Sequence, residues 1–247
     1  AEVLAWFDAR KPTSTQGWVR FGAALLEQGQ KDEAVTVLRK AWVDGKFTKS
    51  QEKQFYKRFR RYLTKADHED RLDRLLWEGQ YWPSRRMLWK VNEDLRLLAE
   101  ARFLLRQMKG NVDTAVSKVP KHLKNDPGLI YERLRWRRRK GKDTSARELL
   151  VNLPENLPYP KLWFKEREIL ARRALNDGLI SEAYTIVSHH GFGPESAAGY
   201  AGAEWLSGWI ALRFLGEAEW GYKHFVNMAE NVRYPISLAR GGYWAGR

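Results

Sequence analysis

The chain of 247 residues is 43% hydrophobic and carries 12 Trp, 10 Tyr and 10 Phe, which is enough to bury a core and excludes a disordered chain. Its formal net charge of +14 favours anionic partners, such as nucleic acid, anionic lipid or a polymer that bears carboxylates. It contains no Cys, which excludes disulfide bonds and thiol chemistry.

The first elements that the sequence predicts are two helices joined by a turn. Ser14 or Thr15 is placed to cap a helix that runs to about Gln28. The packing positions of the ~34-residue tetratricopeptide (TPR) repeat are Trp-x2-apolar-Gly on the first helix and Ala-x3-apolar on the second. They are filled here by Trp18, Phe21, Gly22, Leu25, Ala34, Leu38 and Ala41. Lys46 stands where that repeat has a proline, and a chance helical hairpin is the alternative.

Further helices follow from apolar residues at helical spacing and from Pro, Gly and capping residues at the ends. We expect them over 48–63, 65–79, 83–91, 93–109, 113–124, 127–141, 143–153, 160–177, 181–190, 196–215, 217–232 and 235–247. No segment alternates between apolar and polar residues and ends in a hairpin turn, so we expect no strand.

Glycines recur at the predicted turns at intervals of roughly 30–40 residues, and each is followed five residues later by a small residue. The turn glycines are Gly79, Gly110, Gly141, Gly178 and Gly216, and the small residues are Ser84, Ala115, Ala146, Ala183 and Gly221. A turn glycine followed by a small residue lets two antiparallel helices approach closely. The sequence therefore predicts an all-α fold, a superhelical solenoid of antiparallel helix hairpins that is TPR-like, as one domain over 1–247. Its expected buried residues include Trp18, Leu38, Leu75, Leu134, Leu170 and Trp209.

One predicted helix carries a basic cluster around an aromatic residue. The cluster comprises Arg133, Arg135, Arg137, Arg138, Arg139, Lys140 and Lys142, on both sides of Trp136. Because the planar guanidinium fork binds carboxylate or phosphate in bidentate fashion, the cluster indicates contact with an anionic polymer. The candidate ligand-binding residues are Arg135, Trp136, Arg137, Arg138 and Arg139. Two alternatives remain open: a solvated helix face, or structural ion pairs with neighbours such as Glu132 and Glu148.

A second, weaker candidate surface is the basic group Lys57, Arg58, Arg60 and Arg61. The sequence shows neither a motif that enters a nucleic-acid groove nor a stacking platform, so we expect no nucleic-acid partner. It also has no apolar run approaching the roughly 18 residues of a membrane-spanning helix, so we expect no transmembrane segment.

No residue pattern indicates catalysis, a metal or a cofactor. His189 and His190 precede Gly191 at a predicted helix end and lack further ligands at suitable spacing, so capping of that helix end is their expected role. Gly-rich phosphate loops, GxSxG elbows and HExxH motifs are absent from the sequence. Nothing in the sequence pairs two carboxylates as a glycosidase requires. We therefore expect no catalytic residue, no cofactor and no metal in this chain.

Five stretches resemble the helical superhelix of the soluble lytic transglycosylases, the Slt-type enzymes that cleave peptidoglycan. They are DHEDRLDRLLWEGQ (67–80), PGLIYERLRWRRRKG (127–141), WFKEREILARRAL (163–175), AEWLSGWIALRFLG (203–216) and NVRYPISLARGGYWAGR (231–247). Their order and spacing match that family as well, so the resemblance covers most of 18–247, and the last stretch is the most specific.

The resemblance implies a non-catalytic helical domain of a periplasmic enzyme, which binds or positions peptidoglycan. A catalytic domain that this chain does not contain would cleave the MurNAc–GlcNAc β-1,4 bonds. In that family the catalytic glutamate belongs to a Glu-Ser motif with a GLMQ-like segment downstream. The chain's one Glu-Ser pair, Glu195-Ser196, has no such segment after it, so we expect the chain alone to be inactive. The alternative function is a TPR-like scaffold that binds a protein partner.

Overall fold

A computed structural model describes residues 2–151, 153–154 and 156–247, and these residues form helices and turns without a strand. The prediction of an all-α protein is confirmed. Contacts divide the chain into two compact units, residues 1–124 and 125–247. The prediction of a single domain over 1–247 stays a prediction.

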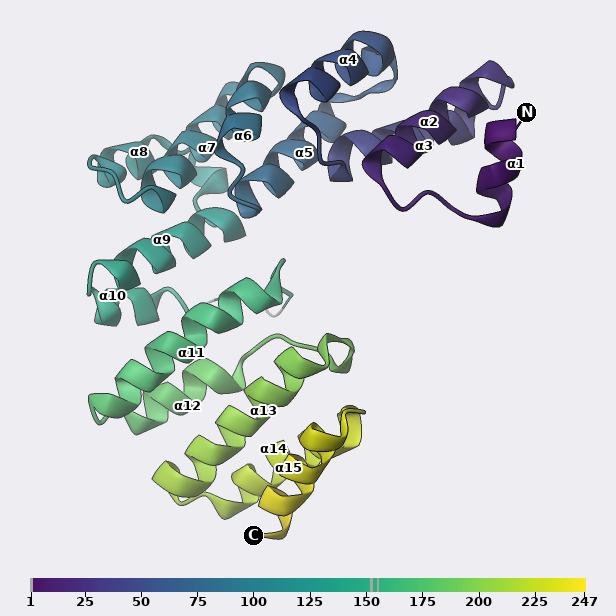
Figure 1. Ribbon diagram of the computed structural model, residues 1–247. Coiled ribbons are helices and arrows are strands. Elements are labelled where there is room, and N and C mark those ends of the chain that lie inside the picture. The colour runs from purple at the N-terminus through teal and green to yellow at the C-terminus, as the bar shows by residue number, and fades with distance from the viewer. Residues whose placement is uncertain (1, 152, 155) are drawn as a thin grey trace. The chain divides into compact units, whose positions relative to one another are not determined.

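The first unit is a succession of short helices (Figure 1), in which α1 packs on α2, α2 on α3, α3 on α5, α5 on α6 and α7, and α7 on α8. In chain order they are α1 (Glu2–Ala9), α2 (Thr15–Glu27), α3 (Lys31–Asp44), α4 (Lys49–Phe59), α5 (Lys65–Trp77), α6 (Tyr81–Met87), α7 (Glu93–Arg106) and α8 (Val112–Lys118), with 3-10 turns η1 (Arg60–Tyr62), η2 (Leu88–Lys90) and η3 (Lys121–Leu123). The helix predicted over 113–124 ends early, because Pro120 cannot continue the backbone hydrogen bonding.

Side chains close the N-terminal ends of four of these helices, and at α7 the Asn92 side chain accepts from the Leu95 N–H at 2.9 Å. The Ser14 hydroxyl accepts a hydrogen bond from the Gly17 N–H, as predicted. Thr48 and Thr64 form capping boxes, in which the threonine hydroxyl and the side chain three residues later bond each other's backbone N–H.

The core of the first unit gathers around Trp42, which is fully buried and stacks on Phe55 with ring centroids 5.4 Å apart. Leu38 and Leu75 are buried in the same cluster, as predicted. Trp18 was expected to be buried but is only half-buried. Its indole N–H donates to the Pro12 carbonyl at 2.6 Å, which holds one ring edge at the surface.

Arginines of later helices bond the carbonyl groups at the ends of earlier helices. From α5, Arg74 Nε donates to the Val43 carbonyl at 2.5 Å and Nη2 to the Gly45 carbonyl at 3.1 Å, at the end of α3. From α7, Arg106 donates to the Leu76 and Trp77 carbonyls at 2.7 and 3.2 Å, at the end of α5. The last carbonyls of a helix have no partner within that helix, so these bonds satisfy them.

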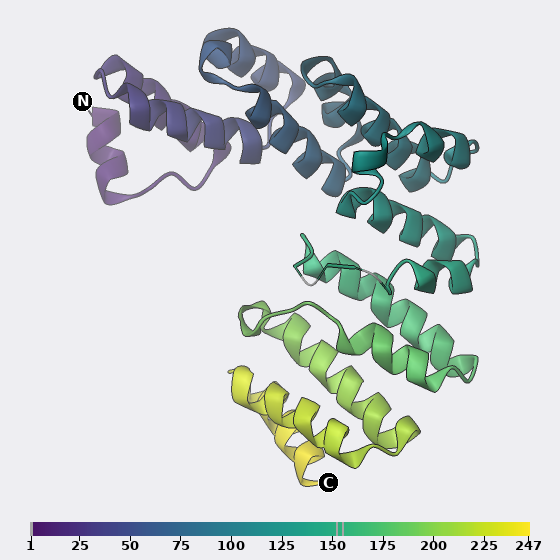
Figure 2. The same ribbon diagram turned by 180° about the vertical axis from the view of Figure 1, so that it is seen from behind.

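The second unit continues the same pattern of neighbouring helices, seen from the other side in Figure 2. Its elements are α9 (Pro127–Arg139), α10 (Asp143–Glu148), α11 (Pro160–Asn176), α12 (Ile180–Ser188), α13 (Ala198–Ile210), α14 (Ala218–Asn231) and α15 (Pro235–Gly246), with the 3-10 turn η4 (Pro194–Ser196) and the π-helical segment η5 (Ala211–Leu215). Leu134 and Leu170 are fully buried, as predicted. Trp209 was expected to be buried but is half-buried, because its ring stacks on Trp205 at 5.8 Å rather than entering the core.

Four of the five predicted turn glycines adopt the left-handed conformation that favours glycine, with φ between 69° and 77°. Gly110 is the exception. In that turn Met108 takes the left-handed conformation at φ 58°, two residues after the end of α7, and Asn111 does so before α8. Gly110 therefore lies in the connection between α7 and α8, as predicted, but the left-handed conformation falls on Met108 and Asn111, because this connection is longer than the others.

Small residues allow close packing between the last three helices. A Cβ at Gly208 of α13 would lie 2.7 Å from the Phe225 ring, and a Cβ at Gly241 of α15 would lie 3.1 Å from the Phe225 carbonyl. Gly221 of α14 approaches α13 in the same way. None of the described helices combines the length and the apolar character that crossing a bilayer requires.

Candidate functional site

The predicted ligand-binding arginines on α9 mostly contact other parts of the second unit. Arg135 lies 3.6 Å from the buried Glu132 carboxylate, and Arg137 donates to the Ser145 carbonyl at 2.5 Å. Arg138 forms a two-pronged ion pair with Glu166 of α11, with Nη2 3.1 Å from Oε1. These contacts favour the structural alternative for three of the arginines, with Glu166 rather than Glu148 as the partner across helices.

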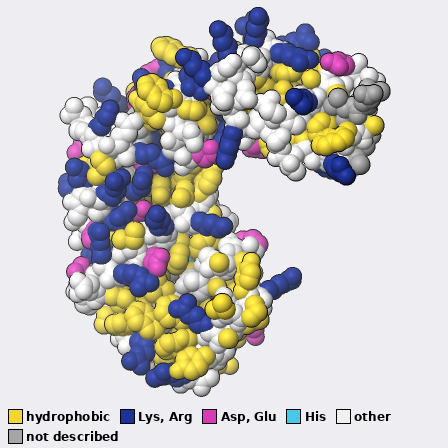
Figure 3. All heavy atoms as spheres, in the orientation of Figure 1, with side chains coloured by type: hydrophobic (Ala, Val, Ile, Leu, Met, Phe, Trp, Pro, Cys, Tyr) yellow, Lys and Arg dark blue, Asp and Glu magenta, His cyan; other side chains and the backbone are white. Residues whose placement is uncertain are grey.

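The other members of the cluster differ in exposure. Trp136 is half-buried with a buried indole N–H, and the Lys142 ammonium lies 5.2 Å from the centre of its ring. Arg139 and Lys140 are exposed at the end of α9. Figure 3 shows Lys and Arg spread over the face in view among hydrophobic side chains, rather than gathered in one basic patch. The role of Arg135, Trp136, Arg137, Arg138 and Arg139 in ligand binding stays a prediction.

The second basic group, Lys57, Arg58, Arg60 and Arg61, is exposed at the end of α4 and in η1. Arg58 lies 3.6 Å from Glu27, and Arg61 donates to the Tyr62 hydroxyl at 2.6 Å. The first is an exposed ion pair, which contributes little to stability and leaves both side chains accessible.

The two most exposed aromatic side chains of the first unit were not among the residues predicted from the sequence. Trp82 of α6 is 71% exposed and Trp89 of η2 is 85% exposed, and both border a shallow hollow of about 570 Å³. The charged side chains around the hollow are paired, Arg85 with Glu100 and Arg96 with Glu93. This surface, the Trp82/Trp89 surface, therefore offers two open indole faces among charges that largely cancel.

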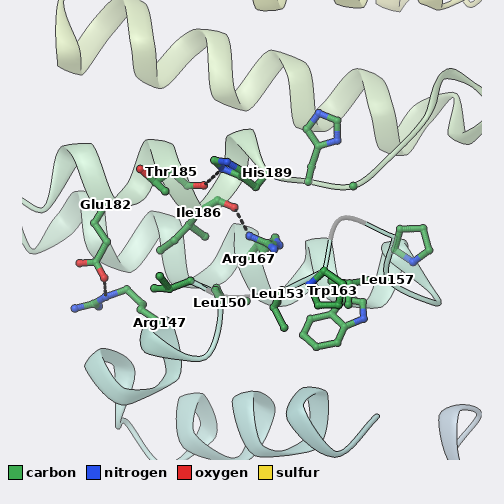
Figure 4. Close-up of a pocket in the computed structure, with 15 residues that line it drawn as sticks. Arg147, Leu150, Leu153, Leu157, Trp163, Arg167, Glu182, Thr185, Ile186 and His189 are labelled. Atoms are coloured by element: carbon green, nitrogen blue, oxygen red, sulfur yellow. Dashed lines mark hydrogen bonds and ion pairs between the residues drawn. The ribbon is translucent and has the colours of Figure 1, made fainter. Parts of the chain in front are cut away.

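The second unit contains a cavity of about 260 Å³ between the end of α10, the start of α11 and the end of α12 (Figure 4). Its wall is mainly apolar, formed by Leu150, Leu153, Leu157, Trp163 and Ile186. Arg147, Arg167 and Glu182 supply the charged groups, and His189 and His190 lie at one edge. A mainly apolar cavity with a few convergent polar groups is the usual form of a small-ligand site.

The two arginines of this cavity differ in their partners. Arg147 Nε donates to Glu182 at 2.9 Å, whereas Arg167 Nη1 donates to the Ile186 carbonyl at 2.9 Å. Both side chains are at least 95% buried, and one nitrogen of each, Arg147 Nη1 and Arg167 Nε, is buried without a hydrogen-bond partner. Burial lowers the pKa of Arg167 to about 10.

A buried polar network next to this cavity centres on Glu204 of α13. His224 Nδ1 donates to Glu204 at 2.6 Å, and His190 Nε2 lies 3.3 Å from the other carboxylate oxygen. The Phe192 N–H donates to His190 Nδ1, which places the His190 proton on Nε2. Burial raises the pKa of Glu204, but the hydrogen bonds from His190 and His224 and the charge of His224 lower it by more, to about 2.

Two tyrosines complete the network around Glu204. The Tyr184 hydroxyl lies 3.0 Å from His224 Nε2, and burial together with the negative charge of Glu204 raises the pKa of Tyr200 to about 12. The sequence signal for this network was a single acidic residue in the otherwise apolar run of α13. A lone buried charge requires partners, but His190 and His224 could not be identified as those partners from the sequence.

The two adjacent histidines have separate roles. His189 is the C-terminal cap of α12, and its Nδ1 lies 2.9 Å from the Thr185 carbonyl, so the predicted capping role is confirmed for His189. His190 instead belongs to the Glu204 network. The described residues include no group of three or more His, Cys, Asp or Glu side chains that could hold a metal ion. Glu195 is exposed on the turn η4.

In comparisons with known proteins, no family model, no curated protein and no solved structure matches the chain.

Proposed function

We propose that this chain is the non-catalytic helical domain of a periplasmic lytic transglycosylase, which binds or positions peptidoglycan for a catalytic domain outside the chain. The observation that carries the proposal is the set of five stretches that resemble the Slt-type superhelix in order and spacing. Each of the five includes a helix or most of one, on α5, α9, α11, α13 and α15.

The proposed architecture is a TPR-like superhelical solenoid of antiparallel hairpins. Its support is the repeated turn, in which a left-handed glycine follows the first helix by two residues and a buried small residue lies on the second helix. Ala34, Ser84, Ala146 and Ala183 are such residues, each with no exposed surface. The arginine bonds between helices about 30 residues apart support stacking of successive hairpins.

Within this proposal, the Trp82/Trp89 surface is the contact for the glycan. The faces of sugar rings expose C–H groups, which pack against the flat face of an aromatic ring, and Trp offers the largest face. The α9 arginines are the second candidate contact, and their ligand would be the carboxylates of the stem peptides. Since the charges around Trp82 and Trp89 are paired within the protein, binding through this surface depends weakly on salt, whereas binding through α9 falls steeply with salt.

Sedimentation with purified sacculi tests the proposal. The chain is expected to pellet with sacculi, and the double variant Trp82→Ala/Trp89→Ala is expected to bind roughly tenfold more weakly, the loss of about 1.4 kcal/mol. The matched control is Trp6→Ala, which removes another exposed Trp, 58% exposed, from α1. The triple variant Arg137→Gln/Arg138→Gln/Arg139→Gln tests the α9 surface, with thermal unfolding measured in parallel.

The competing function, a scaffold for a protein partner, gives the opposite outcome in the same assay. A scaffold stays in the supernatant at physiological ionic strength and is insensitive to the Trp variants. We also expect no lytic activity from this chain. Release of 1,6-anhydromuropeptides that Glu195→Gln abolishes would contradict that part of the proposal.

A further inference from the structure

The cavity of the second unit contains a buried positive charge that is not balanced by a buried negative one. Arg167 is 4% exposed and, among the described residues, bonds only the uncharged Ile186 carbonyl. The carbonyl belongs to the last turn of α12, whose helix dipole compensates part of the charge. A guanidinium removed from water without an anionic partner nevertheless carries a large desolvation cost.

Other buried arginines of the protein are each paired with a carboxylate. Arg71 is paired with Glu52 at 3.2 Å, Arg102 with Asp73 at 2.8 Å and Arg147 with Glu182 at 2.9 Å. Arg167 differs from them in two respects, since it lacks such a pair and it lines a cavity. The lowering of its pKa has burial as its cause, with no compensating contribution from an acidic neighbour.

The cavity supplies donors for an anion and an apolar surface for the rest of a ligand. Arg167 Nε and Arg147 Nη1 are both buried and lack acceptors, and both side chains line the cavity. In Figure 4 Arg167 lies among the labelled apolar side chains of the wall, near Ile186 and Leu153. A volume of about 260 Å³ holds a ligand of roughly ten heavy atoms, at roughly 30 Å³ for each.

We propose that this cavity binds a small monocarboxylate, whose carboxylate pairs with Arg167 and whose apolar body lies among Leu150, Leu153, Leu157 and Trp163. A carboxylate matches the planar fork of a guanidinium and brings a single negative charge, which balances the single unpaired positive one. A phosphate dianion would bring a second charge for which the described wall has no free cation, because Arg147 is already paired with Glu182.

Binding of octanoate to the full chain, followed by calorimetry and by the fluorescence of Trp163, tests this inference. Octanoate has ten heavy atoms, and octanol and octylamine have the same chain with a neutral or a positive head. N-acetyl-alanyl-alanine carries the same carboxylate on a peptide body, so it distinguishes a peptide C-terminus from an aliphatic acid as the source of the ligand. The expected result is that at least one of the two carboxylates binds at least tenfold more tightly than octanol, and that octylamine does not bind.

The variants separate the role of Arg167 from a general effect of charge. Arg167→Met is expected to weaken carboxylate binding at least tenfold and to leave octanol binding unchanged. The matched control is Arg172→Met, which removes a 55% exposed arginine from the same helix and leaves the cavity intact. If neither carboxylate binds the native chain at least tenfold more tightly than octanol, the proposal is overturned whether or not Arg167→Met folds. Undiminished carboxylate binding by a folded Arg167→Met also overturns it.

The experiment also distinguishes a ligand from an acidic residue of the chain itself. Glu155 lies in the connection between α10 and α11, outside the described residues. With Glu155→Gln, carboxylate affinity is expected to stay within twofold of the native value. If the native chain binds no carboxylate and Glu155→Gln does, Glu155 is the partner of Arg167 and the ligand site is overturned. Because these probes contain no glycan, failure here leaves the sacculus assay unaffected, and the reverse also holds.

Discussion

Arg138 and Glu166 form an ion pair that joins α9 to α11. The Glu166 side chain is only 2% exposed, and the two residues are 28 positions apart in the sequence. From the sequence, Arg138 is predicted to belong to a basic surface. In the structure it is the partner of a buried carboxylate.

Replacement of Arg138 by Gln is therefore expected to destabilise the protein. It leaves the Glu166 carboxylate buried without its cation, and breaking a buried pair in this way costs about 3–5 kcal/mol. The free energy of unfolding, measured by chemical denaturation, is the test. Arg139→Gln is the control, because Arg139 is exposed and surface substitutions stay within about 0.5 kcal/mol. Equal effects of the two variants on the free energy of unfolding would show that the Arg138–Glu166 ion pair does not stabilise the fold.

Two glycines of α13 are expected to respond oppositely to Ala. At Gly202 nothing lies within 4 Å of an added Cβ, so Gly202→Ala gains up to about 1 kcal/mol from helix propensity. At Gly208 an added Cβ would meet the fully buried Phe225 ring at 2.7 Å, so Gly208→Ala is expected to cost about 1–3 kcal/mol through overpacking. Thermal unfolding of both variants is the test, with a rise in melting temperature expected for Gly202→Ala and a fall for Gly208→Ala. Stabilisation by Gly208→Ala would contradict the close packing of α13 on α14.

Met108→Gly is expected to stabilise the protein, although glycine usually weakens a chain. Met108 adopts φ 58°, a left-handed conformation that costs a residue with a side chain about 1–2 kcal/mol. Glycine avoids that cost but loses more freedom on folding, about 0.5–1 kcal/mol, so the net gain is up to about 1.5 kcal/mol. Chemical denaturation measures it. Gly141→Ala, in the corresponding turn after α9 at φ 69°, is the reciprocal variant and is expected to destabilise. A loss of stability in Met108→Gly would show that the left-handed conformation of Met108 does not destabilise the native chain.

The Glu204 network makes stability depend on pH in acid. The pKa of Glu204 is about 2 in the folded protein against 4.5 in the unfolded chain, so the folded state binds this proton less readily. The resulting contribution, about 3 kcal/mol, is fully present above pH 4.5 and is lost as the pH falls toward 2. Unfolding free energies across this range should fall in the native chain and fall less in Glu204→Gln. Glu230→Gln, at an exposed carboxylate of α14, should follow the native curve, and a parallel curve for Glu204→Gln would exclude Glu204 as the source.

Local features of the fold could be predicted from the sequence, because the residues that determine them are close together in it. The caps at Ser14 and Thr64 and the glycine turns at Gly141 and Gly178 are of this kind, and the structure contains them. The helix expected over 196–215 begins later, at Ala198, because Pro194 starts a separate 3-10 turn. Its final part is the π-helical segment η5, which no pattern in the sequence predicts.

The candidate sites could not be predicted in the same way, because their residues come together only after the helices pack. Glu166 and Arg138 lie on different hairpins, and so do His190 and Glu204 of the buried network. The exposure of Trp82 and Trp89 is equally a property of packing, since Trp42 and Trp163 are as hydrophobic and are buried. A count of positive charges likewise cannot tell which arginines bond carbonyls inside the protein.

The bonds between Arg106 and the end of α5 also determine an order of events during synthesis. The Trp77 carbonyl receives its bond from an arginine 29 residues later in the chain. At about 5–20 residues per second, the ribosome adds that arginine roughly 1.5–6 seconds after Trp77. Until then the Leu76 and Trp77 carbonyls lack their bonds from Arg106, so the end of α5 is completed only after α7 has been made.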